Sequence, residues 1–152
     1  MYNEIAGAPT TIPETDSVVP RSLFVGTRGY IEKVVRQINA SYDAGLYDCC
    51  AVMCRRLLET LIIEVYERAG RASDIKKDGT HFHMFGELLR IISSDAAFNL
   101  GRNAKKGLED FKRLGDSSAH DRRFNARQSD IDIVRAGMRS SAEELLHLAR
   151  LI

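Results

Sequence analysis

The chain has 152 residues, of which 44% are hydrophobic and 28% charged, a length and composition typical of one globular domain. Its 22 Lys and Arg side chains nearly balance 21 Asp and Glu, and the resulting net charge of +1 excludes a histone-like basic protein and an acidic tail. No apolar run approaches the roughly 20 residues of a membrane-spanning helix, so we expect no membrane partner.

The N-terminal segment contains all three prolines of the chain, Pro9, Pro13 and Pro20, and carries only negative charge. Proline in a helix interior costs about 3 kcal/mol, so the absence of proline after this segment permits long helices. The sequence therefore predicts an extended arm over residues 1–20 and one helical domain over residues 21–152.

The cysteines and the N-terminus indicate a cellular compartment. Cys49, Cys50 and Cys54 lie within one short segment, and an odd, clustered set is a poor disulfide framework. No Lys or Arg precedes Arg21 and no apolar stretch follows the start, which is atypical of a secretory signal. Together these features predict a protein of the reducing cytoplasm.

Apolar residues recur at intervals of three and four in five successive segments, the period of helices that bury one face. These segments run from Ile31 to Tyr42, ended by Gly45; from Leu46 to Ala69, ended by Gly70; from Phe82 to Ile92; from Leu100 to about Leu114, ended by Gly115; and through Ile133 to Leu148, after a capping pair of Ser129 and Asp132. No segment alternates apolar and polar residues for long enough to predict a strand. The fold class expected is all-α, a bundle of four or five helices.

A basic stretch around the end of the fourth predicted helix is the first candidate site. Arg113 and His120 enclose six residues there, and further Lys and Arg residues lie nearby. Such clusters suit phosphate backbones. An alternative is a solvated helix end in which His120 bonds to Asp116. The nearby basic residues are Lys105, Lys106, Lys112, Arg122, Arg123 and Arg127.

The second candidate lies on the second predicted helix, which carries apolar side chains around much of its circumference. Arg55 and Arg56 precede Glu59 by four and three residues, so these charges face each other on a helix. Because the helix is expected to be central, Arg56 and Glu59 should be less exposed than Glu64 and Glu67. The pairs would hold an anion or orient a neighbouring helix.

A metal site could be imagined from His81 and His83 together with Cys50 and Cys54. Both cysteines lie on the apolar face of their helix, where cysteine usually behaves as a small hydrophobe. We therefore expect no metal ligands and no cofactor.

The charged motifs, in this order and on these helices, resemble the HEPN superfamily, and more narrowly a prokaryotic branch of helical domains of unknown function. The resemblance spans roughly residues 20–152. It implies a four-helix bundle with an extra helix, and commonly a two-fold homodimer. The motifs that carry it are Arg28-Gly-Tyr-Ile-Glu32, Arg55-Arg56-Leu57-Leu58-Glu59, Leu114-Gly-Asp-Ser-Ser-Ala-His120 with Arg122 and Arg123 following, and Glu143-Glu144-Leu-Leu-His147.

Active members of this superfamily are metal-independent endoribonucleases that use an arginine followed four to six residues later by a histidine. The resemblance therefore gives Arg113 and His120 catalytic roles. Active members usually carry a polar residue directly after the arginine, whereas this chain has Leu114. Leu114 favours a module without established catalysis that binds RNA, a nucleotide or a protein partner. Its binding residues would be Arg55, Arg56, Glu59, Asp116, Arg122 and Arg123.

A metal-independent endoribonuclease of the toxin or defence type is the alternative. RNA supplies its own nucleophile, the 2′-hydroxyl, so cleavage needs a base and positive charge on the developing phosphorane. The His120 imidazole is suited to moving the proton, and the Arg113 guanidinium to gripping two phosphate oxygens.

Overall fold

A computed structural model describes residues 11–152 of the chain, which form five α-helices and two short 3₁₀ helices. No strand occurs in this range; Lys76 and Phe82 form one isolated antiparallel bridge. The all-α fold class is confirmed. The elements are η1 (Arg21–Leu23), α2 (Gly29–Asp43), α3 (Tyr47–Arg68), η2 (Ala72–Ile75), α4 (Phe85–Ser94), α5 (Arg102–His120) and α6 (Gln128–Leu148).

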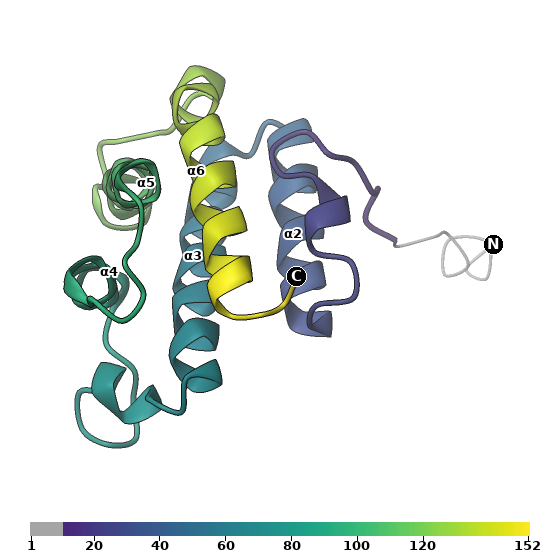
Figure 1. The fold of residues 1–152 in the computed structure, drawn as a ribbon. Helices are drawn as coiled ribbons and strands as arrows, with labels where there is room; N and C mark the ends of the chain where they lie inside the picture. The colour runs from purple at the N-terminus through teal and green to yellow at the C-terminus, as the bar shows by residue number, and fades with distance from the viewer. Residues whose placement is uncertain (1–10) are drawn as a thin grey trace.

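The other helices pack around α3, with α2 and α6 running roughly along it and α4 and α5 crossing it (Figure 1). In Figure 1, α2, α3 and α6 run upright, whereas α4 and α5 are seen close to end-on, so these two cross the others at a steep angle. Helix α3 contacts all four other α-helices, as its apolar circumference predicts. None of the helices in the described range is long and apolar enough to cross a membrane.

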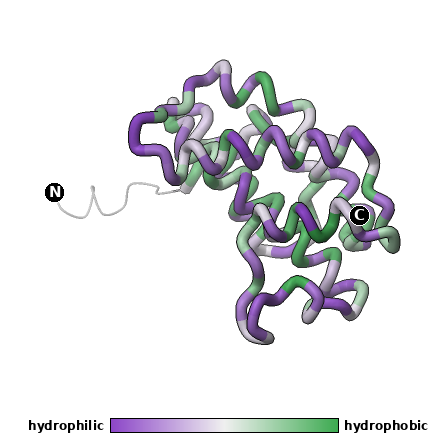
Figure 2. Tube along the Cα trace, turned by 90° about the vertical axis from the view of Figure 1, so that its left-hand side faces the viewer, coloured by the Kyte–Doolittle hydropathy of each residue, from purple (hydrophilic) through white to green (hydrophobic). Residues whose placement is uncertain are grey.

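The core follows from amphipathic periodicity. Figure 2 shows hydrophobic and hydrophilic stretches alternating along the helices. Gly45 and Gly70 end α2 and α3 in the left-handed region, at φ values of 76° and 70°, which glycine adopts without a steric penalty. The largest fully buried side chains come from α2, α3, α4 and α5 and from the two 3₁₀ segments, and include Phe24, Ile31, Leu57, Tyr66, Phe85 and Phe111.

The predicted helix break at Gly115 is wrong, because α5 continues to His120. Gly115 is buried against α3, and a Cβ at this position would lie 3.0 Å from the Cβ of Arg55. Eight residues earlier, a Cβ on Gly107 would lie 2.4 Å from the carbonyl oxygen of Gly137 on α6. Both glycines therefore serve close helix packing rather than chain reversal.

Two predicted helix starts also differ from the structure. Helix α4 begins at Phe85, because Phe82 lies in the isolated bridge outside it. Helix α6 begins at Gln128, where the Asp130 carboxylate accepts the backbone N–H of Arg127 at 2.8 Å. Asp132, assigned to a capping pair from the sequence, instead accepts the hydroxyl of Tyr42 at 2.6 Å.

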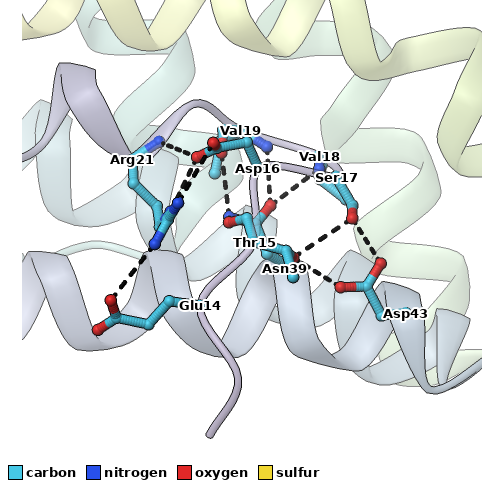
Figure 3. Close-up of polar contacts among 9 residues, drawn as sticks. All are labelled: Glu14, Thr15, Asp16, Ser17, Val18, Val19, Arg21, Asn39 and Asp43. Carbon is cyan, nitrogen blue, oxygen red and sulfur yellow. Dashed lines mark hydrogen bonds and ion pairs between the residues drawn. The ribbon is translucent and has the colours of Figure 1, made fainter.

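Of the predicted arm, residues 1–10 lie outside the described range, and residues 11–20 form no helix or strand. Residues 14–19, the strap, lie along α2 (Figure 3). The Asn39 side chain accepts the backbone N–H groups of Val18 and Val19 at 2.8 and 2.9 Å. Its amide nitrogen donates to the carbonyls of Thr15 and Val19. The strap is thereby bonded to the bundle, with Val18 and Val19 in the core.

Candidate functional site

Arg113 and His120 lie on one side of α5. Seven residues are nearly two helical turns, so the two residues point in almost the same direction, about 10.5 Å apart along the axis. Both are exposed, and the Arg113 side chain retains 75% of its accessible surface. Arg113 donates to Asp110, one turn back towards the helix start, and makes no contact with His120. The two predicted catalytic residues therefore share a face without forming a pair.

A different arginine lies next to His120. Nη1 of Arg55 on α3 is 3.4 Å from Nε2 of His120 and 3.3 Å from Oδ1 of Asp116. Nζ of Lys112 donates to the other oxygen of Asp116 at 2.8 Å. We call these four residues the α3/α5 charge cluster. It ties the second half of α5 to the central helix.

Gly115 explains why Arg55 can reach this position. The Arg55 stem passes over the glycine, where a Cβ would lie 3.0 to 3.5 Å from its first three carbons. Only 13% of the Arg55 side chain is exposed, so the stem is buried while the guanidinium meets its partners at the surface. A partly buried guanidinium requires such partners, because an unpaired buried charge is costly.

Arginine can only donate hydrogen bonds, which fixes the direction of its contact with the imidazole. Nε2 of His120 must accept from Arg55, so the imidazole proton of this arrangement lies on Nδ1. The expected bond between His120 and Asp116 is replaced by one in which Arg55 bridges the two. With Nδ1 protonated and Nε2 accepting from Arg55, the imidazole could accept a proton from a hydroxyl only after its contact with Arg55 is released.

Glu59 lies one turn after Arg55 and is half-buried. Burial raises the pKa of its carboxyl, and the positive charges of Arg55 and Arg56 only partly oppose that shift. Within residues 11–152, Glu59 forms no ion pair shorter than 4 Å; Arg56 is exposed. The predicted inward pairing of these side chains is thus absent from the described contacts.

The predicted order of exposure on α3 is wrong for Glu64, which is buried while Arg56 is exposed. Glu64 accepts the hydroxyl of Tyr30 and lies 3.5 Å from Nε of Arg28, both from the start of α2. Because these two partners bond to it, the Glu64 carboxylate can be buried between α2 and α3. Glu67 is exposed, and Glu59 is less exposed than Glu67 as predicted.

Arg122 and Arg123 follow the end of α5 and are exposed. Of the eight residues proposed from the sequence, the structure brings together Arg55, Asp116 and His120, and leaves the others apart. Sequence reasoning included Lys112 in the basic stretch but did not identify it as a partner of Asp116. The spacing of four between Lys112 and Asp116, typical of a helical ion pair, was the available signal.

Exposed cations continue along the outer side of α5. The cations Arg102, Lys106 and Arg113 and the imidazole of His120 are separated by four, seven and seven residues, which places them within about 40° of one line on the helix. The exposed carboxylate of Glu109 lies about 20° to one side of this line. We call this line the basic face of α5. Residues 102–127 contain eight Lys or Arg and four Asp or Glu, a local charge of +4 in a chain of net +1.

No family model, curated protein or solved structure significantly matches this chain. Its function must therefore be inferred from the geometry of its own residues. In the described range no group of three or more His, Cys, Asp or Glu is arranged to hold a metal ion. Cys50 and Cys54 are buried in the core, and His81 is exposed and bonded to Asp78.

Proposed function

We propose that this protein is an RNA-binding module that holds phosphate groups along the basic face of α5, without catalysing a reaction. The observation that carries the proposal is the line of exposed cations Arg102, Lys106 and Arg113, with His120 at its end. The line extends about 27 Å along the helix, so a nucleotide-sized ligand would leave most of this face unused.

Phosphate contacts supply most of the affinity of proteins that bind nucleic acid without sequence preference, because each neutralised phosphate releases counterions. Exposed Lys and Arg side chains suit this role. They meet phosphates at little desolvation cost, and Arg can bind two oxygens at once. Arg122 and Arg123 extend the positive surface beyond the helix end.

The α3/α5 charge cluster has a supporting role in this proposal. Arg55 holds Asp116 and His120 from the side of α3, so it fixes the end of α5 relative to the central helix. Asp116 in turn is shared with Lys112. The cluster thereby keeps the basic face straight and presented to solvent up to His120.

An endoribonuclease is the second candidate, and the shared exposed side of Arg113 and His120 favours it. In that reaction His120 would accept the proton of the 2′-hydroxyl while a guanidinium stabilised the phosphorane. Within one chain, however, Arg55 is the guanidinium beside His120, and Arg113 is bonded to Asp110. A composite site would need the two-fold homodimer that the HEPN resemblance implies.

Charge reversal of the basic face tests the RNA proposal. We expect Arg102→Glu, Lys106→Glu and Arg113→Glu together to weaken binding of a 20-nucleotide RNA on the order of 100-fold in fluorescence anisotropy, and to reduce the salt slope by about 2. The matched control reverses three exposed cations elsewhere: Lys33, Arg68 and Lys77.

An equal loss in both triple variants, or no RNA binding by the wild type, would contradict the proposal. Cleavage that survives a chelator, leaves a 2′,3′-cyclic phosphate and falls about 10²–10⁴-fold in His120→Ala would support the endoribonuclease instead.

A further inference from the structure

A groove of about 470 Å³ lies between α4 and α5, on a side of α5 different from its basic face. Arg90 and Ser93 of α4 form one wall; Lys105, Glu109, Lys112 and Arg113 of α5 form the other. Its size is within the range of small-molecule sites. Only Arg113 belongs to both surfaces, so the groove is a separate feature of the fold.

The groove is lined by four cations and one carboxylate. Carboxylates outside the lining balance three of the cations: Glu87 bonds to Arg90, Asp116 to Lys112 and Asp110 to Arg113. Lys105 has no ion-pair partner shorter than 4 Å within residues 11–152. The external pairs orient the cations without filling the groove.

The paired cations keep donors for a ligand. Arg90 bonds to Glu87 through Nε and Nη2, and Arg113 bonds to Asp110 through Nη2, which leaves Nη1 of both guanidiniums without a described protein acceptor. Lys112 uses one of its three N–H groups on Asp116. An anion in the groove could therefore be bound without breaking these pairs.

Two small residues of α4 also shape this wall. The Ser93 hydroxyl is buried and has no hydrogen-bond partner among the described residues, although a buried hydroxyl usually has one. Gly86 leaves room for Lys112, whose Cε would lie 2.8 Å from a Cβ at that position. The lysine can thus lie across α4 and close one end of the groove.

We infer that the α4/α5 groove binds a pyrophosphate group, either free or as part of a nucleotide. Phosphate oxygens match the donors offered by Arg and Lys. Lys105 and Lys112 are two turns apart, about 10.5 Å along α5. Two linked phosphates contact both lysines more readily than one phosphate does.

Titration calorimetry with inorganic pyrophosphate, ADP and inorganic phosphate tests the inference on the full chain. We expect pyrophosphate and ADP to bind at least about 10-fold more tightly than phosphate, because linked phosphates meet more cations. Equal affinities for pyrophosphate and ADP would show that the pyrophosphate group is recognised and that the nucleoside adds nothing. Tighter binding of ADP would identify a nucleotide as its source.

Lys105→Ala and Arg90→Ala should each weaken pyrophosphate binding about 10-fold, whereas Lys77→Ala, which removes an exposed lysine outside both the groove and the basic face, should change it less than about 2-fold. Circular dichroism verifies folding, and all three side chains are at the surface. A similar loss in Lys77→Ala, phosphate binding as tight as pyrophosphate binding, or no binding at millimolar pyrophosphate would overturn the inference.

The RNA and pyrophosphate measurements separate the two proposals. Wild-type protein that binds RNA through the basic face but not pyrophosphate would reject the groove alone. Protein that binds pyrophosphate in the groove but not RNA would reject the RNA proposal alone.

Discussion

Asn39 and Arg55 each hold two parts of the molecule together, yet their hydrogen-bonding groups are used to different degrees. The Asn39 amide is buried, and both its oxygen and its nitrogen make two bonds to the strap. Arg55 places one nitrogen against Asp116 and His120. Its remaining N–H groups have no described protein acceptor.

This difference distinguishes polar groups whose bonds are made within the protein from polar groups that remain free to bind a ligand. Around the strap, Arg135 and Arg139 of α6 also donate to backbone carbonyls, those of Ser17 and Val18 (Figure 3 shows these strap residues). The buried Asn39 amide, with all its bonds made inside the protein, stabilises one conformation of the strap. Along α5 the cations are exposed and only partly paired, so they can bind something other than the protein itself.

The largest expected effect is at the strap. Asn39→Leu keeps the side-chain volume but leaves two backbone N–H groups and two carbonyls without their partner. Each buried group left unbonded costs about 1–3 kcal/mol, so we expect a loss of about 3–5 kcal/mol in the free energy of unfolding by urea. Gln37→Leu, an exposed change on the same helix, is the control. Equal stability of the two variants would show that the strap does not depend on Asn39.

A smaller effect is expected where the strap meets Asp43. Hydrogen bonds from the Ser17 and Thr15 hydroxyls lower the pKa of the Asp43 carboxyl. A lowered folded-state pKa stabilises the fold above the unfolded pKa near 3.9, and this contribution is lost as the pH falls through the folded-state pKa. Asp43→Asn should therefore be less stable than wild type at pH 7 and equal to it near pH 2. A difference that persists in acid would mean that shape, not charge, explains it.

The smallest effect is expected at Glu59, beside the α3/α5 charge cluster, where the substitution should raise rather than lower the free energy of unfolding. Burial raises the pKa of Glu59, so its contribution to stability is present below its unfolded pKa and is lost as the pH rises through the folded-state pKa. Glu59→Gln should be slightly more stable than wild type at pH 7, with the difference vanishing near pH 3. Thermal unfolding at both pH values measures this. A less stable variant at pH 7 would indicate that the charge of Glu59 is needed by Arg55 or Arg56.

Periodicity was sufficient to predict the helices, because each helix buries one apolar side and α3 buries several. It was insufficient for Gly115, since the same residue type ends helices and permits close packing, and only the position of Arg55 distinguishes these uses. The start of α6 was misplaced because Ser129 and Asp132 have the spacing of a cap while Asp130 forms it.

The site was harder to predict than the fold. Arg55 and His120 are 65 residues apart, and no local pattern indicates that their side chains meet. The same limit applies to Glu64, whose burial depends on Tyr30 and Arg28 from another helix. The sequence suggested Asp116 as a partner of His120 because both follow the predicted helix end, but it did not indicate the arginine between them.

The two close approaches of α5 have a consequence for how this protein can diversify. Gly107 fixes the helix against α6 and Gly115 fixes it against α3, and both lie on the inward side. The geometry of the helix is therefore set by residues that no ligand on its outer side touches. Substitutions along that outer side change the surface chemistry without moving the backbone, so new binding preferences can accumulate there while the fold stays constant.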